Sequence, residues 1–213
     1  MKLYTYFRSS ASYRVRIALA YKGLAHDAAY VNLPKKEHQA DAFRAVNPQA
    51  LLPALEDGGR ILIQSLAILE YLDETHPEPP LLPQAPLDRA YVRAVAQIVA
   101  CEMHPLNNLR TLRYVKHSYK LDDDGVNTWY RHWIADGFAM LESYLAREGR
   151  AGRYCYGDMV TIADCCLVPQ VFNAQRYACD LAPYPTIVRV FDECMKLDPF
   201  ASTQPSKEAD AVP

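Results

Sequence analysis

The first 24 residues, MKLYTYFRSSASYRVRIALAYKGL (1–24), change character at one point. A short strand is expected over residues 2–6, and a helix over residues 13–22, with Gly23 as its stop. Between them stand Arg8, two serines, Ala11 and Ser12. The first turn of a helix offers unpaired N–H groups and the positive end of the helix dipole, so this junction fits an anion or thiolate site. Taken alone, it fits an ordinary turn capped by Ser12 better.

The next residues continue a mixed pattern of strands and helices. Strands are expected over residues 28–32, 54–56 and 60–63, with the hairpin turn Asp57-Gly58-Gly59 between the last two. Helices are expected over residues 39–46 and 65–74, which gives the order βαβ followed by ββα. Five prolines in HPEPPLLPQAP (76–86) exclude a helix or a central strand there and mark a domain boundary.

The remaining chain is predicted to be helical. Helices are expected over residues 87–114, 126–147, 162–177 and 185–196. The predicted domains are therefore 1–80, a linker at 81–86, and a helical domain at 87–213. The polar, proline-containing tail from about residue 201 is expected to be disordered.

Composition excludes several classes of function. The chain has 213 residues and a net charge of −2, so it carries no basic surplus for nucleic acid or an anionic membrane. It has no apolar run of membrane-spanning length and no signal-peptide pattern, which predicts a cytoplasmic protein.

The six cysteines form no C-x-x-C pair and are expected as reduced thiols in or near the core. Cys101 and His104 lie one helical turn apart, but two ligands do not make a metal site, and none is predicted.

Four further motifs could carry chemistry or only structure. If the peptide bond before Pro53 is cis, Leu52 offers its backbone to an extended peptide. Gln64-Ser65 could hold a carboxylate at a helix start, or Ser65 could simply be the N-cap. Thr161-Ile162-Ala163-Asp164 is read as a structural capping box. The fourth is a set of three arginines, Arg8, Arg110 and Arg176. Arginines are exposed on the surface by default, but together these would suit a substrate with two or more carboxylates.

These motifs together resemble the zeta class of glutathione transferases. The likeness extends from residue 1 to about residue 200 and rests on YFRSSASYRVRIAL, NPQALLPAL, IQSLAILEYLDETHP, HPLNNLR, GDMVTIADCCLVPQV and DLAPYPTI. It implies a thioredoxin-like N-terminal domain, with a mixed four-stranded sheet and helices, followed by an all-α C-terminal domain. It also implies a homodimer, with glutathione as cofactor and a dicarboxylate as substrate.

The resemblance assigns roles to individual residues. Ser9 and Ser10 would act catalytically on the sulfur of glutathione, and Arg8, Arg110 and Arg176 would bind the substrate carboxylates. Glutathione itself would be bound by Ser9, Ser10, Ala11, His38, Leu52, a cis Pro53, Gln64, Ser65, His104, Asn108, Leu109 and Arg110. Ala11 stands where the family often has cysteine, and Tyr13 where it often has tryptophan. A protein thiol therefore plays no part at residue 11.

The implied activity is a glutathione-dependent cis–trans isomerisation. The expected substrate is maleylacetoacetate, converted to fumarylacetoacetate in tyrosine and phenylalanine breakdown. Maleylpyruvate is the alternative substrate, and conjugation of glutathione to haloacids or aryl halides is a further alternative. A binding module without catalysis is a fourth, which the intact Ser9, Gln64 and Ser65 argue against.

Overall fold

A computed structural model describes residues 1–211 and divides the chain into two compact units. The first unit contains Met1–Leu81 and the chain from Met195 onward, and the second contains Leu82–Cys194. The sequence analysis places the boundary near residue 80, and the first unit ends at Leu81. The last residues, expected in the helical domain, group with the first unit. In the described part of the chain, no helix is long and apolar enough to cross a membrane.

A four-stranded sheet in the order β2-β1-β3-β4 organises the first unit. Its strands are β1 (Lys2–Thr5), β2 (Asp27–Tyr30), β3 (Ala54–Asp57) and β4 (Arg60–Ile63). β1 pairs in parallel with β2 and antiparallel with β3, and β3 pairs antiparallel with β4. The parallel pair needs a crossover, which α1 (Ser10–Tyr21) supplies, whereas Asp57 and Arg60 close the hairpin.

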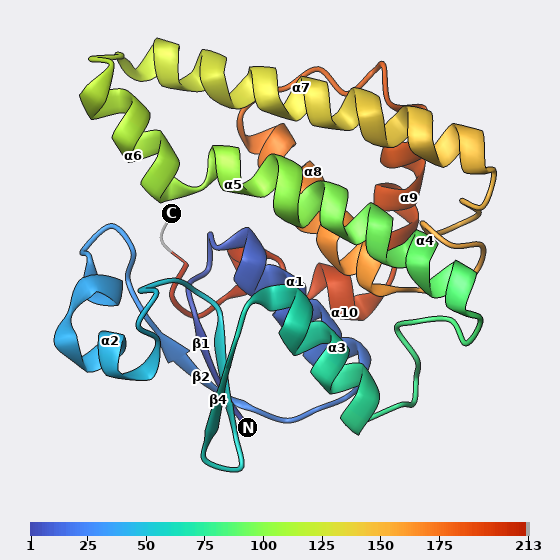
Figure 1. Ribbon diagram of the computed structural model, residues 1–213, viewed down its shortest axis with the longest axis horizontal. Helices are drawn as coiled ribbons and strands as arrows, with labels where there is room; N and C mark the ends of the chain where they lie inside the picture. The colour runs from blue at the N-terminus through green and yellow to red at the C-terminus, as the bar shows by residue number, and fades with distance from the viewer. Residues whose placement is uncertain (212–213) are drawn as a thin grey trace. The chain divides into compact units, whose positions relative to one another are not determined.

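Helices cover both faces of this sheet, as Figure 1 shows. Successive side chains of a strand point to opposite faces. Tyr4 of β1 meets the ring of Phe43 in α2 (Asp41–Val46), at 5.9 Å between ring centres. Its neighbour Thr5 accepts a hydrogen bond from Arg16 of α1, which packs beside α3 (Ser65–Thr75). The end of β1 is therefore held by contacts with α2 and with α1.

Lys22 joins the end of α1 to the end of α3. Its ammonium group donates to Asp73 at 2.9 Å and to the carbonyls of His76 and Pro79 at 2.8 and 2.7 Å. Asp73 also accepts from the backbone N–H of Leu81 at 2.7 Å. Because all three donor positions of the buried ammonium are used, this pair fixes the geometry of the two helices.

The second unit is built from helices. They are α4 (Pro86–Gln97), a π-helical segment η2 (Ile98–Met103), α5 (His104–Asn107), α6 (Leu109–Ser118), α7 (Asp123–Glu148), α8 (Ile162–Arg176) and α9 (Pro185–Met195). α8 is buried along most of its length and packs on α4. η2 and α7 approach so closely at Gly137 that a side chain there would collide with Met103.

The single helix predicted over residues 87–114 is wrong. Pro105 lacks a backbone N–H, which prevents a regular helical hydrogen bond at that point, and the preceding turns widen into η2. The backbone then becomes extended at Asn108 (φ −67°, ψ 146°), whose side chain caps α6 by accepting from Arg110 N–H. A proline and a capping asparagine therefore interrupt the segment, which consists of α4, η2, α5 and α6.

The tail predicted to be disordered from residue 201 is ordered as far as residue 211. It contains α10 (Asp198–Ala201) and the 3₁₀ turn η3 (Pro205–Lys207). Phe200 and Pro205 are buried, and the carbonyl of Phe200 accepts a hydrogen bond from the Tyr13 hydroxyl of α1 at 2.7 Å. The polar composition of the tail predicted disorder because only these few residues anchor it. For residues 212–213, which lie outside the described chain, the expectation stays a prediction.

Candidate functional site

The junction between β1 and α1 places Ser9 at the cap of the helix. α1 begins at Ser10, and the Ser9 hydroxyl oxygen accepts from the backbone N–H of Ser12 at 3.2 Å and from the Ser12 hydroxyl at 3.0 Å. The interpretation of Ser12 as N-cap is therefore wrong by one turn. Since both acceptor positions of the Ser9 oxygen are used, its own O–H is oriented to donate elsewhere.

The first turn of α1 is a favourable place for negative charge. Ser10 and Ala11 form this turn and are 7% and 8% exposed. No acidic residue stands in the turn, so its N–H groups and the helix dipole are not neutralised by the helix itself. Arg8, just before the cap, is exposed, with its guanidinium 5.0 Å from the ring of Phe7. Ser9 and the first turn of α1 together fit a bound thiolate.

Leu52 and Pro53 are joined by a cis peptide bond. Leu52 is half-buried and lies just before β3, outside the pairing of that strand with its neighbours. Asn47 braces the loop before it, because its side chain donates to the carbonyl of Leu51 at 2.8 Å and accepts from Gln49 N–H at 3.0 Å. The loop therefore presents the Leu52 backbone from a fixed position.

Gln64 and Ser65 open α3, but their roles differ from the predicted capping. Gln64 is the cap residue, in the left-handed region at φ 70°, and Ser65 is the first helical residue. The buried Ser65 hydroxyl oxygen accepts from the guanidinium of Arg14 at 3.1 Å. Its O–H therefore remains for an acceptor such as a carboxylate, beside a positive charge and the first N–H groups of α3. The side-chain amide of Gln64 donates to Gln49 at 3.0 Å.

His38 completes the residues predicted in the first unit. It lies in the 3₁₀ turn η1 (Glu37–Gln39) and is 8% exposed. Arg14 and Gln49 were missed by the sequence analysis, although each touches a predicted residue. An arginine at a buried position of the expected helix was the available signal for Arg14.

The second unit holds the other predicted binding residues around Asn108. The Asn108 amide lies 3.4 Å from the His104 ring nitrogen, and its oxygen accepts from the backbone N–H of Arg110 at 3.1 Å. Leu109 is 36% exposed, and the Arg110 side chain is also exposed. His104, Asn108 and Arg110 are thus gathered by the break between α5 and α6.

Arg176 ends α8 with an exposed side chain that contacts two tyrosines. Its guanidinium lies 4.6 Å from the ring centre of Tyr177 and hydrogen-bonds the buried Tyr130. Tyr130 stacks on Tyr177 at 3.6 Å, and burial raises the pKa of its hydroxyl, so Tyr130 stays neutral. These contacts fix a cation at the helix end, which suits binding of a carboxylate.

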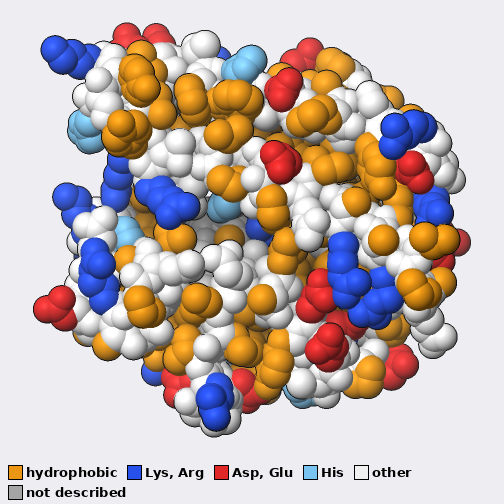
Figure 2. Space-filling model, viewed as in Figure 1, with side chains coloured by type: hydrophobic (Ala, Val, Ile, Leu, Met, Phe, Trp, Pro, Cys, Tyr) orange, Lys and Arg blue, Asp and Glu red, His pale blue; other side chains and the backbone are white. Residues whose placement is uncertain are grey.

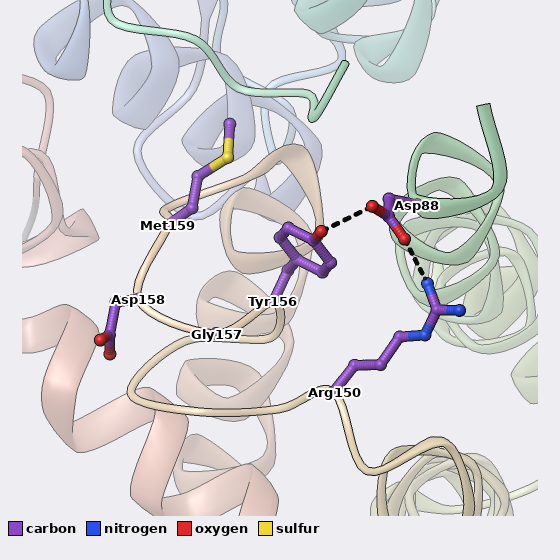
Figure 3. Close-up of a pocket in the computed structure, with 6 residues that line it drawn as sticks. All are labelled: Asp88, Arg150, Tyr156, Gly157, Asp158 and Met159. Carbon is purple, nitrogen blue, oxygen red and sulfur yellow. Dashed lines mark hydrogen bonds and ion pairs between the residues drawn. The ribbon is translucent and has the colours of Figure 1, made fainter. Parts of the chain in front are cut away.

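A separate depression of about 520 Å³ in the second unit holds none of the predicted residues. Figure 3 shows Asp88 at its edge, where it accepts from the Tyr156 hydroxyl at 2.8 Å and from Arg150 at 2.6 Å. Gly157, Asp158 and Met159 complete the lining. Arg150 and Tyr156 lie in the loop that follows α7, and both bind the Asp88 carboxylate. We interpret this network as a link between that loop and the start of α4.

The cysteines do not form a chemical centre. Cys155, Cys165, Cys166 and Cys194 are buried, as predicted, whereas Cys101 is exposed and Cys179 is half-buried. The prediction of core thiols is therefore wrong for Cys101, because η2 turns it outward. Residues 1–211 contain no group of three or more histidine, cysteine or acidic side chains placed to hold a metal.

Comparisons with known proteins agree with this fold. Residues 3–80 match the family model of the glutathione S-transferase N-terminal domain. The chain is 47% identical to a solved maleylpyruvate isomerase described as a bacterial zeta-class glutathione S-transferase, with a TM-score of 0.97 and full coverage of both chains. It is 45% identical to a probable maleylacetoacetate isomerase of Vibrio cholerae, over 98% of this chain and 97% of the relative.

A third relative was solved with ligands. The maleylacetoacetate isomerase of Methylobacterium extorquens AM1, with bound malonate and glutathione, is 39% identical, with a TM-score of 0.97 and full coverage of both chains. The chain belongs to the glutathione S-transferase family and, within it, to the zeta class. The resemblance, the fold class, the assignment as an isomerase and glutathione as cofactor, all predicted from the sequence, are confirmed at the level of this family.

Proposed function

We propose that the protein converts maleylacetoacetate to fumarylacetoacetate by a glutathione-dependent cis–trans isomerisation. The observation that carries this proposal is the Ser9 hydroxyl, whose oxygen accepts two hydrogen bonds and whose O–H is left to donate at the N-terminus of α1. Full-length relatives named as isomerases support the reaction class. Bound glutathione supplies a thiol that adds reversibly to the cis double bond, so that the bond can rotate.

The residues of the first unit fit glutathione. In the proposed arrangement Ser9 donates to the sulfur and favours its ionised form, with Ser10, Ala11 and the first turn of α1 around it. Leu52, before the cis Pro53, pairs with peptide backbone. Ser65 and Gln64 receive the γ-glutamyl carboxylate, and Arg14 adds positive charge through Ser65. His38, His104, Asn108, Leu109 and Arg110 complete the proposed binding set.

The substrate carboxylates are proposed to be bound by Arg8, Arg110 and Arg176. All three guanidinium groups are exposed, and each can bind a carboxylate through two parallel hydrogen bonds. Holding both ends of the substrate orients its double bond, which is the main contribution that positioning makes to the rate.

Arg176→Ala should raise the KM for the dicarboxylate about tenfold or more, because a charge-assisted hydrogen bond is lost. The Kd for glutathione should change little. Steady-state kinetics and calorimetry measure the two quantities, and Arg147→Ala, which removes another exposed arginine of the second unit, is the matched control. An unchanged KM would remove Arg176 from the substrate site.

Maleylpyruvate is the second candidate substrate, favoured by the solved relative at 47% identity. Each compound has a cis double bond conjugated to a carbonyl, and each carries two carboxylates. The same residues would therefore bind either one. The ratio of kcat/KM for the two compounds decides between them, and we expect maleylacetoacetate to be preferred. Conjugation to an aryl chloride should be slow by comparison.

We further propose a cytoplasmic homodimer. The zeta-class resemblance supports the dimer, since most soluble oligomers are symmetric assemblies of identical chains. Acidic and basic side chains lie interspersed on the face drawn in Figure 2, in keeping with a net charge of −2. Sedimentation velocity should give twice the mass of the chain, and a concentration-independent monomer would contradict the proposed dimer.

A further inference from the structure

Arg16 is a buried arginine that none of the roles above uses. It lies on α1 and is 3% exposed. Its guanidinium donates to the Thr5 hydroxyl at 3.1 Å, to the carbonyl of Tyr6 at 3.4 Å and to the carbonyl of Phe7 at 3.2 Å. These acceptors lie at the end of β1 and at the start of the turn that leads to Ser9.

The other side of Arg16 is occupied by residues 203–210, which we call the C-terminal strap. The Nε atom of Arg16 lies 3.1 Å from the Glu208 carboxylate and 3.2 Å from the carbonyl oxygen of Thr203. Asp210 of the strap accepts a hydrogen bond from the backbone N–H of Phe7 at 3.1 Å. The strap therefore holds Phe7 on both sides, directly at its N–H and through Arg16 at its carbonyl.

This arrangement extends to Ser9 within two residues. The carbonyl of Tyr6, which Arg16 contacts, also accepts the backbone N–H of Ser9 at 2.9 Å. Arg16 and the strap therefore contact the backbone of residues 6 and 7, and the carbonyl of Tyr6 in turn binds the Ser9 N–H. We expect a displacement of the strap to change where the Ser9 hydroxyl points.

Burial makes this network costly to form. Burial lowers the pKa of Arg16 and raises the pKa of Glu208, because both charges leave water. A buried ion pair contributes little net stability compared with an apolar pair of the same size, whereas its geometry is specific. A positioning role explains why two charges are placed there better than a stabilising one does.

We propose that the C-terminal strap positions the thiol-activating serine, and that Arg16, Glu208 and Asp210 are its positioning residues. The inference rests on the proposed function, since it assigns Ser9 to the sulfur of glutathione. It predicts that loosening the strap weakens activation of the thiol more than it weakens glutathione binding.

Glu208→Gln and Asp210→Asn, alone and combined, test the proposal while retaining the size of each side chain. Glu74→Gln, at an exposed position near the end of α3 in the same unit, is the matched control. The first readout is the pKa of the thiol of bound glutathione, from the ultraviolet absorbance of its thiolate. The others are the Kd by calorimetry, thermal unfolding, and hydrogen exchange at the Phe7 and Ser9 amides.

The combined variant should raise the pKa of the bound thiol by about one unit and lower kcat/KM at neutral pH on the order of tenfold. Its Kd for glutathione should change less than about threefold, because the peptide-binding residues are untouched. Exchange at the Phe7 and Ser9 amides should become faster, whereas Glu74→Gln changes none of these quantities.

Two results would overturn the proposal, and a third concerns the function alone. An unchanged thiol pKa with a lower unfolding temperature would show that the strap is only structural. Unchanged exchange at Phe7 and Ser9 would show that it does not hold the turn. If the unmodified protein did not bind glutathione, the proposed function would fail, and the exchange measurement would still decide whether the strap positions Ser9.

Discussion

Ser9→Ala should lower kcat/KM at neutral pH about a hundredfold, because it removes the donor proposed for the thiolate. Loss of one donor placed at a developing or bound negative charge typically has an effect of this size. The thiolate is the reactive form, and losing a donor to it raises the pKa of the thiol. The pH profile of kcat/KM should therefore shift to higher pH, with part of the activity recovered there.

Ser9 is also the cap of α1, so the variant needs a structural control. Losing a serine cap costs about 1 kcal/mol, which thermal unfolding should detect. Ser12→Ala removes the hydroxyl that donates to Ser9 at 3.0 Å but leaves the Ser9 O–H in place. It should lower kcat/KM far less. Equal losses in both variants, with no shift in the pH profile, would show that Ser9 acts only as a cap.

Asp164→Ala should cost about 3 kcal/mol or more of stability, the largest effect expected outside the site. Asp164 has no exposed surface and accepts from the N–H groups of Cys155 and Thr161, both at 2.7 Å, and from the Thr161 hydroxyl at 2.9 Å. Removing the carboxylate leaves buried donors at the start of α8 without partners. The midpoint of urea unfolding measures the loss.

Asp158→Ala is the control for this measurement, since Asp158 pairs with Arg153 at the surface of the same unit. An exposed pair contributes less than about 1 kcal/mol, so its midpoint should hardly move. If Asp164→Ala unfolded at the midpoint of the unmodified protein, the capping box would not carry the stability assigned to it.

Local chemistry predicted much of the fold. The four strands, the hairpin at Gly58-Gly59 and the capping box before α8 all follow from signals within a few residues. Family resemblance, rather than the residues alone, predicted the cis bond before Pro53. The cap of α1 was misjudged because three serines lie close together there and neighbouring positions compete to cap a helix. Ser65 was misjudged because the cap falls one residue earlier, at Gln64.

Contacts between distant parts of the chain could not be predicted in this way. Arg14 and Arg16 were visible as charges at buried helical positions, but nothing near them identified Ser65 or Glu208 as partners. The strap is ordered by contacts with Arg16 and Phe7, which lie far away in the sequence. Because its own polar composition gave no sign of these contacts, the tail was expected to be disordered. Periodicity predicts which face of a helix is buried, but it does not predict which residue meets it there.

The most direct test is the glutathione dependence of maleylacetoacetate isomerisation by the purified protein, followed by the loss of cis-enone absorbance. We predict rapid conversion with glutathione, none without it, and no net consumption of glutathione over many turnovers. Conversion at the same rate without glutathione, or no conversion of either maleylacetoacetate or maleylpyruvate with it, would contradict the account.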